Sequence, residues 1–222
     1  MSDNKKVNVA VVVGRHPYDV IEFDDSFAWI PEVRCYQQHM EQFVKSPKDV
    51  REWYDVVCFY NWHNDIPDPA TEKWYESGII PAMEALGETK QGIIMLHHAL
   101  VAWLDWRLWD SITGIQNRVF TYHHNQKMHL EIVDREHPIT KGLSDWDMID
   151  EGYRMASANE GSNNHILIKT DHPNCMASIA WTRMYNNSKV FCFESGHDKK
   201  AFLNKNYQEV LRRGILWAAG RI

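Results

Sequence analysis

The chain has 222 residues, of which 44% are hydrophobic and 24% are charged, and its formal net charge is −6 at pH 7. This composition is typical of a folded protein with a substantial core, and the length favours one α/β domain over residues 1–222. Nucleic-acid binding depends on clustered Lys and Arg side chains that displace counterions from the phosphates. The net negative charge of this chain therefore argues against a nucleic-acid partner.

Membrane and secretory signals are not expected from this sequence. The longest apolar runs, residues 7–13 and 92–96, are strand-sized, and residues 1–6 lack the apolar segment of a signal peptide. The cysteines show no C-x-x-C spacing: Cys35, Cys58, Cys175 and Cys192. Two of them, Cys58 and Cys192, lie in apolar runs where reduced, buried thiols are usual. We therefore expect a cytoplasmic protein without disulfides.

In the first half of the chain, predicted strands alternate with predicted helices. Residues 7–13 are rich in β-branched side chains, which is typical of a buried parallel strand. Residues 24–26 (Asp-Asp-Ser) are candidate N-caps for a short helix that ends before Pro31. Residues 55–60 form the second predicted strand, and residues 69–86 are expected to be mostly helical with a break.

The third predicted strand, residues 92–96, runs directly into two adjacent histidines and then into a tryptophan-rich helix at residues 101–110. The later elements are four strands in a β-rich region, a last strand and a closing amphipathic helix: 128–133, 148–155, 166–169, 177–184, 190–194 and 207–219. The alternation favours a three-layer αβα sandwich with a mainly parallel central sheet. We expect the β-rich middle to extend this sheet or to form a flap.

Polar side chains come directly after several of these predicted strands: His16, His63, His97, His98, Glu194 and His197. The carboxyl ends of parallel strands share one edge of a sheet, and ligands bind there in α/β proteins. A single histidine is more often structural than functional. The positions of His97 and His197 nevertheless favour a functional role.

Two further groups of residues have alternative interpretations. Asp150 and Glu151, followed by Tyr153, either supply a carboxylate base or metal ligand or form a solvated acidic turn. Residues 134–143 are interpreted as a structural turn because of their proline and glycine. Among the ten tryptophans, core packing explains most, and Trp62 is the one expected in a pocket, where its flat face suits a sugar ring.

Several well-known motifs do not occur in the sequence. There is no G-x-G-x-x-G after a strand, no P-loop, no H-E-x-x-H and no G-x-S-x-G. We therefore expect no nucleotide cofactor and no serine-esterase chemistry.

Motifs along nearly the whole chain resemble the ThuA-like, or trehalose-utilisation, proteins, which share the class I glutamine amidotransferase-like (flavodoxin-like) fold. The matching segments are 54–57, 92–100, 105–106, 137–143, 150–153, 195–197 and 213–220. The resemblance implies a role in carbohydrate metabolism, with trehalose-type or oxidised (keto) sugars as substrates and a small-molecule carbohydrate as the partner. A homo-oligomer is compatible with it.

The parent amidotransferase fold uses a cysteine nucleophile at a strand–helix elbow and a histidine after a late strand. Here the elbow carries His97 and His98, and His197 resembles the late-strand histidine. Glutaminase activity is therefore not expected, because imidazole does not replace the attacking thiolate. The residues instead suggest acid–base chemistry or a divalent metal, zinc or manganese, bound by His97, His98 and His197.

The leading hypothesis is an enzyme that isomerises, eliminates from or hydrolyses a sugar or keto-sugar. Its predicted catalytic residues are His98, His197, Glu151 and Glu194. The predicted substrate-binding residues are His16, Trp62, His63, Asp150 and Tyr153. The alternatives are a non-catalytic sugar-binding or regulatory protein, and a cofactorless hydrolase in which His197 activates water.

Overall fold

The computed structural model describes residues 5–71, 73–158 and 163–222. Its nine strands are β1 (Val7–Gly14), β2 (Val33–His39), β3 (Val56–Asn61), β4 (Gly92–Leu96), β5 (Thr121–Ile132), β6 (Trp146–Arg154), β7 (His165–Lys169), β8 (Ser178–Tyr185) and β9 (Ser188–Phe193). The helices are α1 (Val20–Ala28), α2 (Met40–Lys45), α3 (Lys48–Glu52), α4 (Ile79–Glu84), the 3₁₀ helix η1 (His97–Val101), α5 (Arg107–Thr113), α6 (Lys199–Phe202) and α7 (Lys205–Ala218).

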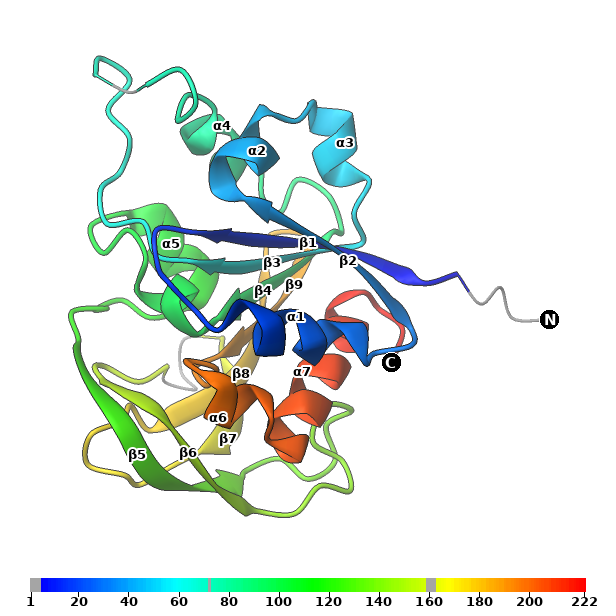
Figure 1. The fold of residues 1–222 in the computed structure, drawn as a ribbon, viewed down its shortest axis with the longest axis vertical. Coiled ribbons are helices and arrows are strands. Elements are labelled where there is room, and N and C mark those ends of the chain that lie inside the picture. The colour runs from blue at the N-terminus through cyan, green and yellow to red at the C-terminus, as the bar shows by residue number, and fades with distance from the viewer. Residues whose placement is uncertain (1–4, 72, 159–162) are drawn as a thin grey trace.

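The strands form one sheet in the order β2-β1-β3-β4-β9-β8-β7-β5-β6. The first five pair in parallel, and β8, β7, β5 and β6 continue the sheet in antiparallel fashion. The carboxyl ends of the parallel strands and the β5–β6 pair lie on the same side of the molecule, on the left of Figure 1. The predicted α/β fold is confirmed, and the β-rich middle extends the sheet.

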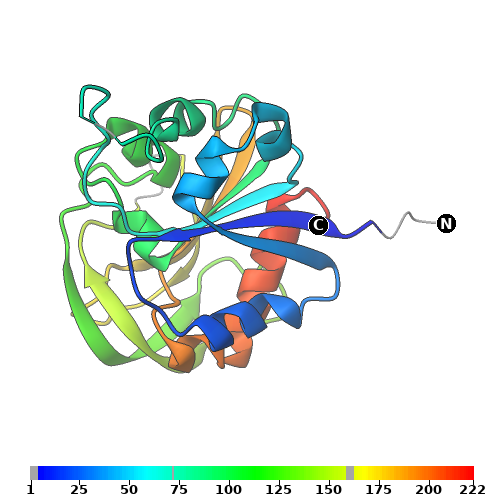
Figure 2. The same cartoon turned by 45° about the horizontal axis from the view of Figure 1, so that its top comes forward.

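Helices cover both faces of the parallel half, as the two-residue period of a strand requires. Along β1, Val9 and Val11 belong to the core under α1 and α7, whereas Ala10 and Val12 belong to the core under α2, α4 and α5. Figure 2 shows α2 on one side of the sheet and α1 and α7 on the other. Gly214 permits the close packing of α7, because a Cβ there would lie 2.3 Å from the Phe191 ring.

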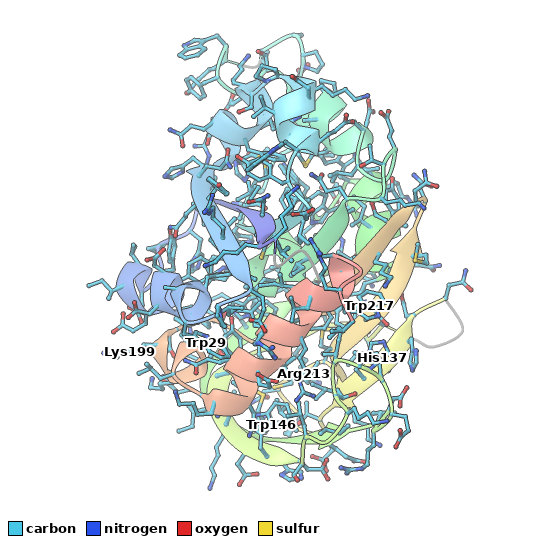
Figure 3. The ribbon with its side chains drawn as sticks, turned by 90° about the vertical axis from the view of Figure 1, so that its right-hand side faces the viewer. Trp29, His137, Trp146, Lys199, Arg213 and Trp217 are labelled. Atoms are coloured by element: carbon cyan, nitrogen blue, oxygen red, sulfur yellow. The ribbon has the colours of Figure 1, made fainter. Side chains whose placement is uncertain are left out.

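The turn at residues 134–143 is docked against α7. The Asp134 carboxylate accepts the backbone N–H groups of Glu136 and His137, which closes the turn. The Arg213 guanidinium donates to the carbonyl of Lys141 at 2.6 Å. Figure 3 shows Arg213, His137 and Trp217 on this face, away from the carboxyl ends of the parallel strands.

Several predicted helices differ from those observed. Residues 24–26 lie inside α1, which begins at Val20, so they are not N-caps. Within 69–86 only α4 is helical among the described residues. The tryptophan-rich segment forms η1 and then α5, with a non-helical link between them.

β2 was not predicted from the sequence, because after the buried Val33 its side chains are exposed or half-buried and form no apolar run. No helix in the described parts of the chain is long and apolar enough to span a membrane.

Candidate functional site

The ends of β1, β4 and β9 bring four histidines together. His97 and His98 begin η1 directly after β4, and the pairing of Leu96 with Phe193 places this turn beside the end of β9. The His98 ring centroid lies 3.8 Å from that of His16, and the His97 centroid lies 5.3 Å from that of His197. The predicted convergence of these strand ends is therefore present in the structure.

His97 occupies a sharp turn with a backbone φ of 46°. This left-handed conformation is uncommon outside glycine and occurs at strained functional turns. The His97 Nδ1–H donates to the Glu194 backbone carbonyl, which directs Nε2 toward the interior of the site. The elbow thus presents a buried, oriented imidazole.

Glu151 of β6 joins these histidines from the antiparallel half of the sheet. Its Oε2 lies 3.3 Å from His97 Nε2 and 3.2 Å from His197 Nδ1, and its Oε1 lies 2.8 Å from His124 Nδ1. Burial raises the pKa of Glu151, but the hydrogen bond from His197 and the adjoining His97 ring outweigh it and hold the pKa well below its usual range. Burial lowers the pKa of His197, and its hydrogen bond to Glu151 more than compensates, so the pKa is raised.

Asp150 and Glu194 are buried and bond to the backbone. Asp150 accepts the N–H groups of Gly196 at 2.8 Å and His197 at 3.1 Å, so it fixes the turn that carries the His197 ring. Glu194 Oε1 accepts the Tyr153 N–H at 2.9 Å. Burial raises the pKa of both carboxyls. Neither residue lines the adjacent cavity, and their geometry is that of positioning groups.

A cavity of about 140 Å³ opens beside the histidines and is lined by His16, Trp62, His98, Phe120, Tyr122, His124, Glu151 and Tyr153. Its walls combine aromatic faces with imidazole and carboxylate groups. Tyr122 is 57% exposed and the His124 side chain is 53% exposed, so the mouth lies at β5. An outer hollow of about 410 Å³ shares His16 and His124 with it.

The His98 ring is 98% buried at this cavity, and neither ring nitrogen has a hydrogen-bond partner within the described ranges. A buried polar group without a partner is destabilising by about 1–3 kcal/mol. Burial, followed by the nearby His97, keeps the pKa of His98 well below its usual value. His98 therefore presents a neutral imidazole with an unused donor and an unused acceptor.

Most, but not all, of the predicted site residues meet here. His63 stacks on Trp103, with ring centroids 5.2 Å apart, and faces a separate hollow with Arg15 and Glu76. Trp62 lines the cavity, as predicted for its position.

Three lining residues were not predicted: Phe120, Tyr122 and His124. Their spacing of two residues, which places them on one side of an extended chain, was the available signal.

Comparisons with known proteins agree with this fold. The family model described as "ThuA: Trehalose utilisation" matches residues 40–218. A ThuA-like protein from Parabacteroides merdae has a TM-score of 0.75 and 18% identity, with 98% of this chain and 92% of that chain covered. A cytoplasmic protein from Salmonella typhimurium has a TM-score of 0.66 and 13% identity, with 95% and 99% covered.

A glutamine amidotransferase from Thermotoga maritima is also similar in fold, with a TM-score of 0.52, 8% identity, and 95% of this chain and 98% of that chain covered. No curated protein matches the chain.

Proposed function

Because the chain belongs to the ThuA family, whose description is trehalose utilisation, we propose that its cavity binds one ring of a sugar or keto-sugar and that the protein is an enzyme acting on that ring. The main support is His98, a buried imidazole on the cavity wall with no internal partner. A ligand hydroxyl or carbonyl would accept from the N–H of the ring, and a second ligand hydroxyl would donate to its other nitrogen.

The size and lining of the cavity support a single ring. Its volume of about 140 Å³ is close to that of a cavity that holds one benzene molecule, about 150 Å³. Trp62 and Tyr122 offer flat apolar faces for the C–H side of a sugar, and His16 and His124 offer polar groups for its hydroxyls. The outer hollow is continuous in its lining with the cavity and can accept whatever is attached to that ring.

The reaction that best suits these groups begins with removal of a proton next to a sugar carbonyl. In a 3-keto-glycoside the hydrogen on C2 is acidic, and His98, which lines the cavity, is the base we assign to it. If the C1–O bond then breaks, a C1=C2 double bond forms and the alcohol leaves with a proton. If a proton is instead delivered to the opposite face of C2, the sugar is epimerised, and if it is delivered to C3, the carbonyl moves to C2. Hydrolysis of an unoxidised glycoside is the third reaction to test.

Thiol chemistry is not part of this proposal. The elbow position carries His97, and Cys58 and Cys192 are buried within β3 and β9. Burial raises the pKa of both thiols, which removes the thiolate required for attack on glutamine. A cytoplasmic location, which is stated for the Salmonella typhimurium protein, fits the reduced state of these cysteines.

The test is hydrogen exchange of a 3-keto-glucoside in D₂O followed by NMR, with trehalose and glucose as unoxidised comparisons. We expect protein-dependent loss of the C2 hydrogen signal, and His98→Ala to lower the rate by about 10²–10⁴-fold. The control is His63→Ala, which removes a buried histidine outside the cavity and should retain the rate.

Binding of the sugar without exchange, elimination or hydrolysis would instead identify a sugar-binding or regulatory protein. Absence of binding to all three sugars would refute the proposal.

A further inference from the structure

The His97 Nε2 atom has too many polar neighbours for one nitrogen. It lies 3.0 Å from the Tyr153 hydroxyl, 3.3 Å from Glu151 Oε2 and 3.3 Å from His197 Nδ1. An imidazole nitrogen carries either one hydrogen or one lone pair, so it makes one good hydrogen bond. Three partners at these distances indicate a point where several ligand atoms converge.

The tautomer of His97 determines which of these neighbours its Nε2 atom can bind. Its Nδ1–H donates to the Glu194 carbonyl, which leaves a lone pair on Nε2 in the neutral ring. That lone pair faces a carboxylate oxygen, which also offers only lone pairs. The Tyr153 hydroxyl is placed to donate to His97 Nε2 and the His197 ring to Glu151 Oε2, whereas a cation between the two atoms would bind both of them at once.

The distances among three of these atoms have the dimensions of a metal site. His97 Nε2, His197 Nδ1 and Glu151 Oε2 are separated from one another by 3.3, 3.2 and 3.3 Å. Ligand atoms about 2.0–2.1 Å from a tetrahedral zinc ion lie about 3.3–3.4 Å apart. The three atoms therefore match one face of a zinc tetrahedron.

We propose that His97, His197 and Glu151 bind a divalent metal ion of the zinc class, with the fourth position available to water or substrate. Two histidines and one glutamate are a ligand set of catalytic zinc sites. The set predicted from sequence, His97, His98 and His197, has ligand atoms within 4.8 Å of one another. This proposal replaces His98 with Glu151, because Glu151 Oε2 lies only 3.3 and 3.2 Å from the nitrogens of His97 and His197.

The surrounding groups have the arrangement of a second layer that orients metal ligands. The Glu194 carbonyl holds His97, Asp150 holds the backbone of His197, and His124 bonds to the free oxygen of Glu151. Such partners fix the ring and carboxylate orientations, and their loss typically lowers metal affinity by about 10–100-fold.

This inference deepens the proposed function, since a metal at this place would supply a Lewis acid for a sugar carbonyl. Different residues would bind the metal ion and the sugar. His97, His197 and Glu151 would hold the ion, and His98 would remain free to contact the sugar.

The first measurement is the metal content of protein purified without a histidine tag, before and after dialysis against Zn²⁺. We expect one tightly bound Zn²⁺ per chain. Replacement by Co²⁺ should give the intense visible absorption of a four-coordinate ion. Glu151→Gln, which keeps the size of the side chain, should weaken Zn²⁺ binding by more than the roughly 10–100-fold expected for Asp150→Asn.

Two variants serve as controls. His129→Ala removes an exposed histidine that is paired with Asp147 and lies outside the cluster, so Zn²⁺ binding should be unchanged. His98→Ala should also retain Zn²⁺ while losing the sugar. Thermal unfolding of each variant without metal shows whether it is folded.

A folded wild-type protein that binds no stoichiometric Zn²⁺ would overturn the inference, as would loss of Zn²⁺ in His98→Ala with retention in Glu151→Gln. Sugar binding or exchange measured on the same samples separates the two proposals. Metal without sugar refutes the function alone, and sugar without metal refutes the metal site alone.

Discussion

The parallel and antiparallel halves of the sheet contribute different parts of the site. The parallel half supplies imidazoles at the strand ends, among them His16, His98 and His197, as the common edge of parallel strands allows. The antiparallel half supplies the Glu151 carboxylate and, except for Trp62, the aromatic side chains of the cavity wall. Neither half makes the site alone. The geometry of the site therefore depends on how the two halves are held together, and the following changes test that dependence.

The largest effect, loss of ligand binding, is expected from substitution of the histidines at the strand ends. His98→Ala should abolish sugar binding and His197→Ala should abolish metal binding. The partly exposed His197 should change the free energy of unfolding by no more than about 1 kcal/mol, whereas truncation of the buried His98 ring should lower it by about 2 kcal/mol. Calorimetric titration and urea unfolding on the same samples give both quantities. Strong destabilisation with unchanged binding would show that these histidines are structural.

The next largest effect, on the free energy of unfolding, is expected at β8, where the antiparallel half of the sheet meets the parallel half. Trp181 of β8 is completely buried, and its indole N–H donates to the Thr113 carbonyl of α5 at 2.9 Å. Trp181→Ala should lower the free energy of unfolding by about 3–5 kcal/mol, because it leaves a cavity and removes the indole hydrogen bond to Thr113. Trp74, which is 78% exposed, provides the control, and Trp74→Ala should change stability by less than about 0.5 kcal/mol.

A smaller effect, and one that depends on pH, is expected from His63 in the parallel half. Burial lowers its pKa to about 4 from an ordinary 6.5, with Glu41 opposing and Arg15 assisting the change. The folded protein thus favours the neutral ring. The stability contributed by this ring is complete above pH 6.5 and is lost as the pH falls toward 4, by up to about 3 kcal/mol.

Urea unfolding between pH 7 and 4 measures this loss. His63→Gln should make the decline shallower. The buried His98 and the half-buried His16, whose pKa values are also lowered by burial, keep the remaining slope in the same direction. An identical slope in the wild type and His63→Gln would show that His63 does not titrate in this range.

The smallest effect is expected from thiol modification. Burial raises the pKa of Cys35 to about 12 and raises that of Cys175 further, in each case away from the thiolate form. Alkylation of the native protein should leave sugar exchange intact, and glutamine should yield no ammonia. Rapid inactivation by one equivalent of a thiol reagent, with protection by sugar, would return the protein to cysteine-dependent chemistry.

The parallel half was largely predictable because its strands are buried on both faces. Continuous apolar runs such as that of β4 locate the strands, and parallel pairing then places their ends on one edge. This argument does not decide which way a side chain points. His63 follows β3 on the same edge, yet its ring packs on Trp103 instead of entering the cavity.

The antiparallel half was harder to predict, because strand register is set by pairing partners far away in the sequence. Asp150 and Glu151 are neighbours on β6 and point to opposite sides. Asp150 meets the amide groups of the Gly196 turn, and Glu151 meets the imidazoles. Sequence alone gave no means of separating their roles. The bulge in β5 near His123 adds a further irregularity to the wall.

The way in which Asp150 holds the turn after β9 bears on how this scaffold could be redesigned. The Asp150 carboxylate accepts hydrogen bonds from the main-chain N–H groups of Gly196 and His197, and Gly196 provides the φ of 120° that the turn needs. The side chain at position 197 adds only its contacts with His97 and Glu151 to this main-chain anchoring. Exchanging His197 for cysteine or aspartate should therefore leave the loop in place while changing the hardness of the donor atom. Substitution at position 197 would therefore change which metal ion the site prefers without changing the backbone that carries the ligand.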